Sequence, residues 1–175
     1  MMRPFLALAC VALLGCIAAQ DWLVKSLRNN TISAGLTGPY HWWLDGSYVL
    51  LAAALVGAMR GHVGMEFLAV IAATALCLTA VTNTFGPTWD AYLGNHSLWH
   101  SRFTIVVFVS GLALELAGDS GWLWWLTGLN VALPAALYGV LFLLSDWTMD
   151  DPAPSAAAEK LYVLLMCVWF IAWAL

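Results

Sequence analysis

Two histidines flank a tryptophan in the segment GNHSLWHSR, which directly precedes a long apolar run. His96 and His100 are four residues apart, so on a helix both imidazoles project from one face. Two imidazoles at this spacing can share a metal ion, although a zinc site needs at least a third protein ligand. The pair therefore indicates either a metal or haem site, or the hydrated end of a membrane helix.

A second polar group follows Pro39, a residue type that fits the first turn of a helix. His41, Asp45 and Tyr48 follow at spacings of four and three, which places them on one helix face. Asp45 would lie about one and a half turns inside an apolar stretch, where a carboxylate needs a partner or a water-filled cavity. We expect either a ligand-binding role or a carboxylate that fixes helix packing by pairing with His41 or Arg102.

Membrane helices must position these residues. Of the 175 residues, 63% are hydrophobic and 9% are charged, and the mean hydropathy is +0.85, a composition outside the range of soluble domains. A spanning helix needs about 20 mainly apolar residues, so the chain has room for about six. The sequence predicts one all-α transmembrane domain over residues 1–175. The predicted spans are residues 4–24, 39–59, 65–82, 97–117, 121–144 and 157–175.

Alternating spans place the two chain ends and two tight turns on one membrane face, the tight-turn face. The longer polar connections 25–38, 83–95 and 145–155 then share the opposite, long-loop face. The positions of the basic residues alone favour a cytoplasmic location for the long loops. Two observations favour the opposite orientation. Most acidic residues lie in or beside these loops, and the face with the longer loops is usually external in small bacterial membrane proteins. The chain is therefore expected in the inner cell membrane with cytoplasmic termini.

Several function classes lack their sequence signals. The net charge of −4 includes no basic patch, so nucleic acid is not an expected partner. The four cysteines lie in apolar segments without a CxxC spacing, which indicates neither a zinc ribbon nor a disulfide framework. GxSxG, Walker and HExxH motifs do not occur.

Eleven tryptophans could form an aromatic cage for a pigment, a quinone or a lipid chain. Most lie at the ends of predicted spans, where tryptophan anchors helices at the membrane interface. We therefore expect an interfacial belt. Its members are Trp22, Trp42, Trp43, Trp89, Trp99, Trp122, Trp124, Trp125 and Trp147.

Three further polar residues fall within or near the spans. Asn130 is placed near the middle of the membrane, so its amide is expected to face another helix. Glu66 and Glu115 fall near the tight-turn face and are expected to be interfacial carboxylates.

Three stretches together resemble the prokaryotic membrane family called "domain of unknown function 998". They are TISAGL with GP at residues 31–36 and 38–39, FGPTWD at 85–90 followed by His96 or His100, and AEKL at 158–161 with Trp169 and Ala172 after it. The chain has Asn-Thr at 30–31 and lysine at 160 where the family has His-Pro and arginine. The resemblance implies a six-helix bundle with Ser33, Asp90, His100 and Glu159 on the long-loop face, and it implies no activity.

A shorter match involves HSLWH at residues 96–100, which resembles the H-x-x-W-H of the alkaline ceramidase group. Those proteins are seven-helix membrane hydrolases that hold zinc with three histidines. This chain has one predicted span fewer and lacks a clear partner histidine and aspartate at that family's separation.

Two hypotheses of function follow. In the first, the protein is a binding or accessory protein that holds a lipid, a pigment or a larger membrane complex. In the second, it is an enzyme in which His41, His96 and His100 bind zinc that activates water against a lipid bond, or a protein with haem between His41 and His100. The candidate ligand-binding residues are His41, Asp45, Tyr48, Asp90, His96, His100 and Glu159.

Overall fold

The computed structural model describes residues 2–23, 41–84, 96–118, 121–144 and 152–175, and every regular element in these residues is a helix. The helices follow the predicted spans closely. The largest difference is at the last helix, which begins five residues earlier than predicted, because proline suits the first turn of a helix. The helices are α1 (Arg3–Leu23), α3 (His41–Met59), α4 (Met65–Thr84), α6 (His96–Gly118), α7 (Leu123–Leu144) and α8 (Pro152–Ala174).

Five of these helices are long and apolar enough to cross a membrane, namely α1, α3, α4, α7 and α8. Helix α6 has 23 residues, and its charged side chains, Arg102 and Glu115, lie toward its two ends. Between them runs an apolar centre that packs against α4, α7 and α8. The predicted fold class, an all-α membrane bundle of six helices, is confirmed.

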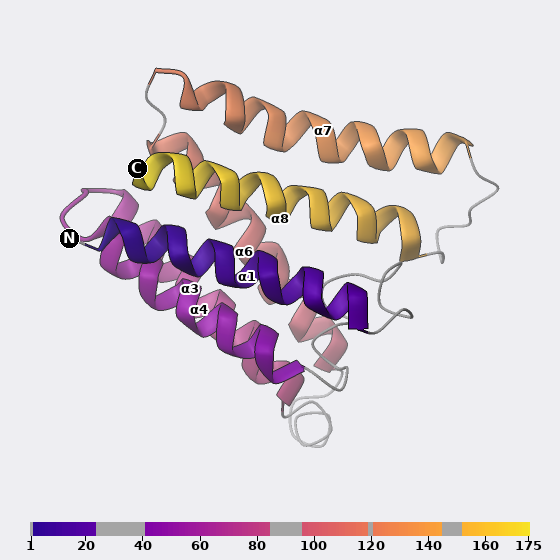
Figure 1. Ribbon diagram of the computed structural model, residues 1–175, viewed down its shortest axis with the longest axis horizontal. Helices are drawn as coiled ribbons and strands as arrows, with labels where there is room; N and C mark the ends of the chain where they lie inside the picture. The colour runs from indigo at the N-terminus through magenta and orange to yellow at the C-terminus, as the bar shows by residue number, and fades with distance from the viewer. Residues whose placement is uncertain (1, 24–40, 85–95, 119–120, 145–151) are drawn as a thin grey trace.

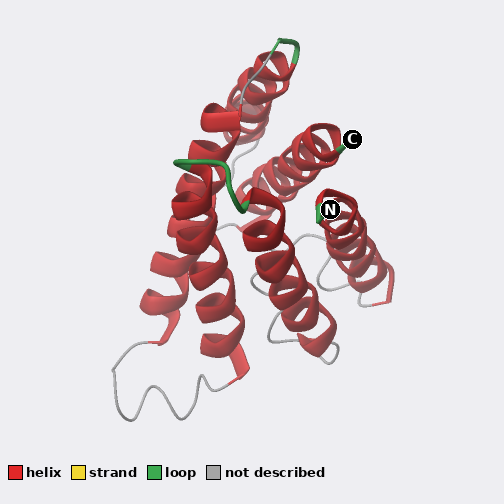
Figure 2. Cartoon of the chain, turned by 90° about the vertical axis from the view of Figure 1, so that its left-hand side faces the viewer, coloured by secondary structure: helices red, strands yellow, loops and turns green. Residues whose placement is uncertain are grey.

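Five helices form a closed ring, and the sixth lies outside it (Figures 1 and 2). Around the ring, α1 packs against α3, α3 against α4, α4 against α6, α6 against α8, and α8 against α1. Helix α7 lies along the outside of α8 and makes a smaller contact with α6. The ring therefore has an interior to which five helices can contribute side chains.

The bundle interior is rich in small residues, and its outer surface is apolar. Alanines of α3 and α4 are buried where these helices pack, which lets their backbones approach closely. Large apolar side chains such as Leu8, Phe67, Val109 and Leu143 are exposed on the outside, as expected for helices surrounded by lipid. The buried alanines are Ala52, Ala54, Ala58, Ala69, Ala72, Ala73, Ala75 and Ala80.

The helix ends occupy two faces, as the alternation of spans predicts (Figure 1). Both termini and the turn at residues 60–64 lie at the tight-turn face. That turn places Gly61 and Gly64 at positive φ angles of 83° and 86°, a conformation that glycine adopts without steric cost. The long-loop face carries the helix ends Leu23, His41, Thr84, His96, Leu144 and Pro152.

The expectation for Glu115 is wrong, whereas that for Asn130 is confirmed. Both side chains have 0% exposure, and the Asn130 Nδ2 group donates a 2.6 Å hydrogen bond to Glu115 Oε1. Because α7 packs over the end of α6, the carboxylate faces another helix and not the headgroups. By contrast, Glu66 is exposed beside the tight turn and accepts a hydrogen bond from the Gly61 amide, as an interfacial carboxylate would.

Candidate functional site

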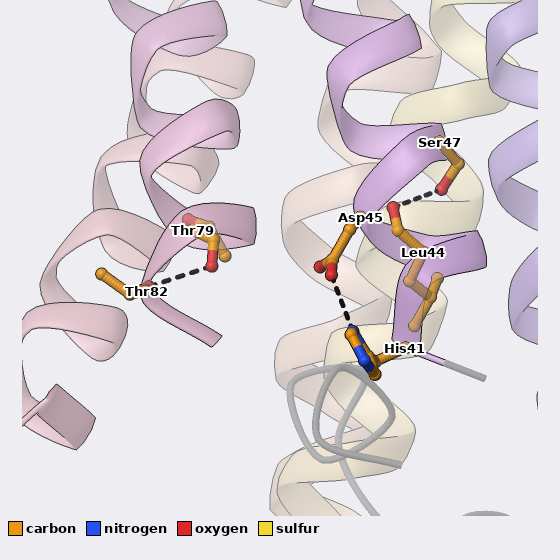
Figure 3. A network of polar contacts seen from close by, with 6 residues as sticks. All are labelled: His41, Leu44, Asp45, Ser47, Thr79 and Thr82. Atoms are coloured by element: carbon orange, nitrogen blue, oxygen red, sulfur yellow. Dashed lines mark hydrogen bonds and ion pairs between the residues drawn. The ribbon is translucent and has the colours of Figure 1, made fainter. Parts of the chain in front are cut away.

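The first polar contact of the candidate site is at the start of α3. His41 Nδ1 lies 2.9 Å from Asp45 Oδ2, one helical turn further along (Figure 3). The side chains are 39% and 16% exposed, so the imidazole lies at the rim and the carboxylate lies deeper. Of the two predicted partners for Asp45, the structure pairs it with His41. Arg102 is exposed and lies over the ring of Trp99, 5.0 Å from the ring centroid.

Hydroxyl groups on α4 continue the polar layer (Figure 3). Thr79 Oγ1 donates to the Ala75 carbonyl at 2.8 Å, and Thr82 Oγ1 is 2.9 Å from the Thr79 carbonyl. Such bonds to the preceding turn satisfy a hydroxyl inside a membrane helix without a second helix. The side chains of both threonines are buried and lie within the bundle.

His100 faces α4 from the first turns of α6. Its side chain is 9% exposed, and its Nδ1 atom lies 3.4 Å from Thr82 Oγ1. Its carbonyl accepts a 3.0 Å hydrogen bond from Thr104 Oγ1. The structure therefore gives the two described histidine side chains of this face different partners: His41 contacts its own helix and His100 contacts α4.

Tyr48 and Glu159 meet at a cavity inside the ring, with space of about 20 Å³, enough for one water molecule. The cavity has a polar part and an apolar part. All five ring helices contribute residues to its lining. The polar lining is Tyr48, Thr79, Thr104 and Glu159, and the apolar lining is Leu13, Leu51, Leu76, Val107, Phe108, Val163 and Met166.

The four polar groups of the cavity share one depth in the bundle. Each lies five to eight residues from the end of its helix at the long-loop face. At 1.5 Å per residue this is about 8–12 Å below the helix ends. A carboxylate at that depth faces a bundle interior or cavity in membrane proteins, and it marks a functional site more often than a surface residue does.

An ion pair joins α1 and α8 beside the cavity. Lys160 Nζ lies 2.7 Å and 2.8 Å from the two carboxylate oxygens of Asp21. The pair closes the ring between the first and last helices, one residue from Glu159. Sequence reasoning missed this contact, although the alternation of spans places both residues at the same face.

The metal hypothesis receives no ligand set from the part of the chain that the structure describes. Within those residues, no group of three or more histidine, cysteine, aspartate or glutamate side chains could hold a metal ion. His96 begins α6, but its side chain, like all of Asp90 and Ser33, lies outside the described residues. A site that includes His96 and Asp90 stays a prediction.

Tryptophans occur at the helix ends, as predicted, and also in the core. Trp22, Trp42 and three tryptophans at the start of α7 are 51–80% exposed at helix ends. Trp169 differs, because it has 0% exposure and stacks parallel to Trp173. The described tryptophans thus include an exposed group at helix ends, where an interfacial belt is predicted, and a stacked pair on α8. The three at the start of α7 are Trp122, Trp124 and Trp125.

Comparison with known proteins identifies no relative. No family model matches the chain, and neither a curated protein nor a solved structure is detectably similar to it. The arrangement of helices and side chains is therefore the basis for the functional argument.

Proposed function

We propose that this protein is a membrane-embedded binding protein that holds the polar end of a lipid-like molecule in its central cavity. The observation that carries the proposal is the convergence of Tyr48 and Glu159, from α3 and α8, on a cavity within a ring of five helices. Ionisable and polar side chains that face the interior of a membrane bundle commonly mark the site of a polar ligand. We therefore assign this cavity to the small polar group of a ligand.

The polar and the apolar residues that line the cavity lie at different depths in the bundle. The tyrosine, threonine and glutamate side chains lie nearest the long-loop face, and the leucine, valine and methionine side chains continue toward the membrane centre. An amphipathic molecule has the same division. The space of about 20 Å³ suits a small end group, and the remainder of the molecule would extend beyond this space.

One contact favours a second candidate function, a zinc-dependent membrane lipid hydrolase. The Asp45 carboxylate bonds to His41 Nδ1, and a carboxylate behind an imidazole is the arrangement that orients a metal-binding histidine. The remaining ligands would be His96 and His100, with zinc activating water. The binding proposal has the stronger support, because the described residues contain no group of three or more histidine, cysteine, aspartate or glutamate side chains that could hold a metal ion.

We further infer that the protein lies in an inner cell membrane with cytoplasmic termini, and that it is related to the "domain of unknown function 998" family. The acidic long-loop face supports this orientation. The three short motifs support the relationship. A reporter fused to the C-terminus should be active in the cytoplasm, and a periplasmic signal would invert the orientation.

Native mass spectrometry of the purified protein tests the binding proposal. Val163 lines the cavity and is 5% exposed, whereas Val168 on the same helix faces outward at 38%. Val163→Phe should fill the cavity and remove a co-purified small molecule. Val168→Phe makes the same change on the lipid side and should retain it.

The melting temperature of each variant shows whether it is folded. If Val163→Phe fails to fold, Glu159→Gln replaces it, because this change removes the charge with little change in volume. A wild-type mass with no adduct, or equal adducts in wild-type protein and Val163→Phe, would contradict the proposal. An adduct with the mass of zinc would favour the hydrolase instead.

A further inference from the structure

We propose that the outer surface of the protein binds a membrane phospholipid in a groove between α4 and α6, with the lipid phosphate at Arg102. This site is separate from the central cavity, so it does not depend on what that cavity binds. The proposal follows from the volume and lining of the groove, from the position of Arg102 beside it, and from the depth of both in the membrane.

The groove has a volume of about 300 Å³, which is at the lower end of the range for ligand pockets. It lies on the lipid side of the bundle, because Val70 and Val106 in its lining are 46% and 39% exposed. Thr74 is the one polar residue among the described residues that line it. The α4 wall is Val70, Ile71, Thr74, Ala75 and Leu78, and the α6 wall is Phe103 and Val106.

A flexible hydrocarbon chain suits this groove better than a transmembrane helix does. Helices pack closely in membranes where small residues let their backbones approach, as the buried alanines of α3 and α4 do. The groove is lined mainly by branched and aromatic side chains such as Ile71, Leu78 and Phe103. An acyl chain has rotatable bonds along its length and can follow such an uneven surface.

A cationic and aromatic group adjoins the groove on α6. Trp99, Arg102, Phe103 and Val106 follow at spacings of three, one and three, which places them on one face of the helix. The Arg102 guanidinium carbon lies 5.0 Å from the centroid of the Trp99 ring, and Trp99 stacks on Phe103 with ring centroids 6.0 Å apart. Since Phe103 lines the groove, these contacts connect the guanidinium to it.

The depths of the two parts match those of a phospholipid headgroup and its acyl chain. Trp99 is three residues from the start of α6, about 5 Å below the helix end, and the guanidinium lies over its ring. The groove lining on α4 runs from Leu78 to Val70, about 9–21 Å below the helix end at Thr84. Tryptophan and the charged head of arginine are typical of the headgroup level.

The guanidinium of Arg102 suits the phosphate of such a lipid. The side chain is exposed, and its contact with Trp99 is a cation–π contact, which needs no N–H hydrogen bond to an acceptor. A guanidinium has five N–H donors in a planar fork that matches two oxygens of a phosphate. A diacylglycerol has the same acyl chains without the phosphate. Recognition of the phosphate and burial of the chains can therefore be tested separately.

Native mass spectrometry of the delipidated protein tests the proposal with two added lipids of identical acyl chains, a phosphatidylglycerol and a diacylglycerol. The wild-type protein should bind the phosphatidylglycerol about tenfold more tightly. Arg102→Gln should weaken that binding about tenfold, the effect of one lost hydrogen bond to a charged group, and should leave diacylglycerol binding unchanged. Arg60→Gln is the matched control, because it removes the same charge from an exposed residue at the tight-turn face.

Phenylalanine variants locate the acyl chain. Val106→Phe narrows the groove and should weaken binding of both lipids. Val168→Phe makes the same change on α8 at nearly the same exposure, 38% against 39%, and should bind as the wild-type protein does. Val163→Phe, which fills the central cavity, should also retain the phosphatidylglycerol. Melting temperatures show which variants fold, and Arg102→Gln changes only an exposed side chain, so it decides the test if Val106→Phe does not fold.

The outcomes distinguish this inference from the proposed function. Equal phosphatidylglycerol binding in Arg102→Gln and Arg60→Gln would overturn the assignment of the phosphate. Equal lipid binding in Val106→Phe and Val168→Phe would overturn the assignment of the groove, as would a wild-type dimer that Val106→Phe disrupts. Loss of the phosphatidylglycerol in Val163→Phe would place this lipid in the central cavity, which contradicts the inference and supports the proposed function.

Discussion

Lys160 on α8 binds both carboxylate oxygens of Asp21 on α1, at 2.7 Å and 2.8 Å, across 139 residues of sequence. The contact joins the first and last helices of the ring at the long-loop face. The side chains are 19% and 29% exposed, so the pair is shielded from much of the solvent. The pair closes the ring, and Lys160 is the next residue in sequence after Glu159, which lines the cavity.

Separating this ion pair should destabilise the bundle. We expect Lys160→Met or Asp21→Asn each to lower the free energy of unfolding by about 1 kcal/mol, because a partly shielded pair contributes about this much. The double variant should lose less than the sum of the two single losses. The free energy of unfolding in mixed micelles is measured for the wild-type protein, the two single variants and the double variant. Additive losses would show that the two side chains do not interact.

Removal of the Asn130 amide should destabilise the contact between α6 and α7. Asn130→Ala leaves the Glu115 carboxylate buried without this donor. We expect a loss of about 1–2 kcal/mol, the range for interhelical hydrogen bonds in membranes. Glu115→Gln retains an oxygen that can accept from Asn130, so its loss should be smaller. Equal stability of Asn130→Ala and wild-type protein would contradict the assigned contact.

Gly118 at the end of α6 is the closest-packed glycine of the described residues. A Cβ atom there would lie 2.7 Å from Met65 Cε and 2.7 Å from Trp169 Cη2, and Trp169 is fully buried. Gly118→Ala should therefore cost about 1–3 kcal/mol by overpacking. Gly128 on α7 has nothing within 4 Å of the same position.

The matched control, Gly128→Ala, should be neutral or stabilise by about 0.5–1 kcal/mol, since alanine favours a helix more than glycine does. Melting temperatures of the two variants give the comparison. If Gly118→Ala melts at or above the temperature of Gly128→Ala, the packing of α6 against α4 and α8 at this end is not as described.

Much of the fold could be predicted from the sequence because lipid restricts the possible structures. Long apolar segments must be helical in a bilayer, and their alternation fixes which ends share a face. The pairing of His41 with Asp45 could also be predicted, because it depends only on spacing within one helix. The inward-facing amide of Asn130 follows from the cost of exposing it to lipid.

The contacts between helices could not be predicted in the same way. The helices are apolar around their whole circumference, so periodicity does not show which face packs inward. The burial of Glu115 depends on α7 covering the end of α6, and the bond between Lys160 and Asp21 depends on α8 returning to α1. Tyr48 and Glu159 were both candidate residues, but their common cavity required the order of helices around the ring.

The most direct test of the binding proposal is native mass spectrometry of a variant that lacks the Tyr48 hydroxyl. Tyr48→Phe deletes one oxygen from the cavity, and Tyr138→Phe deletes the same atom from the exposed side of α7. We predict a co-purified small molecule on wild-type protein and Tyr138→Phe, and a clearly reduced amount on Tyr48→Phe. Equal amounts on all three folded proteins would contradict the assignment of the cavity as the binding site.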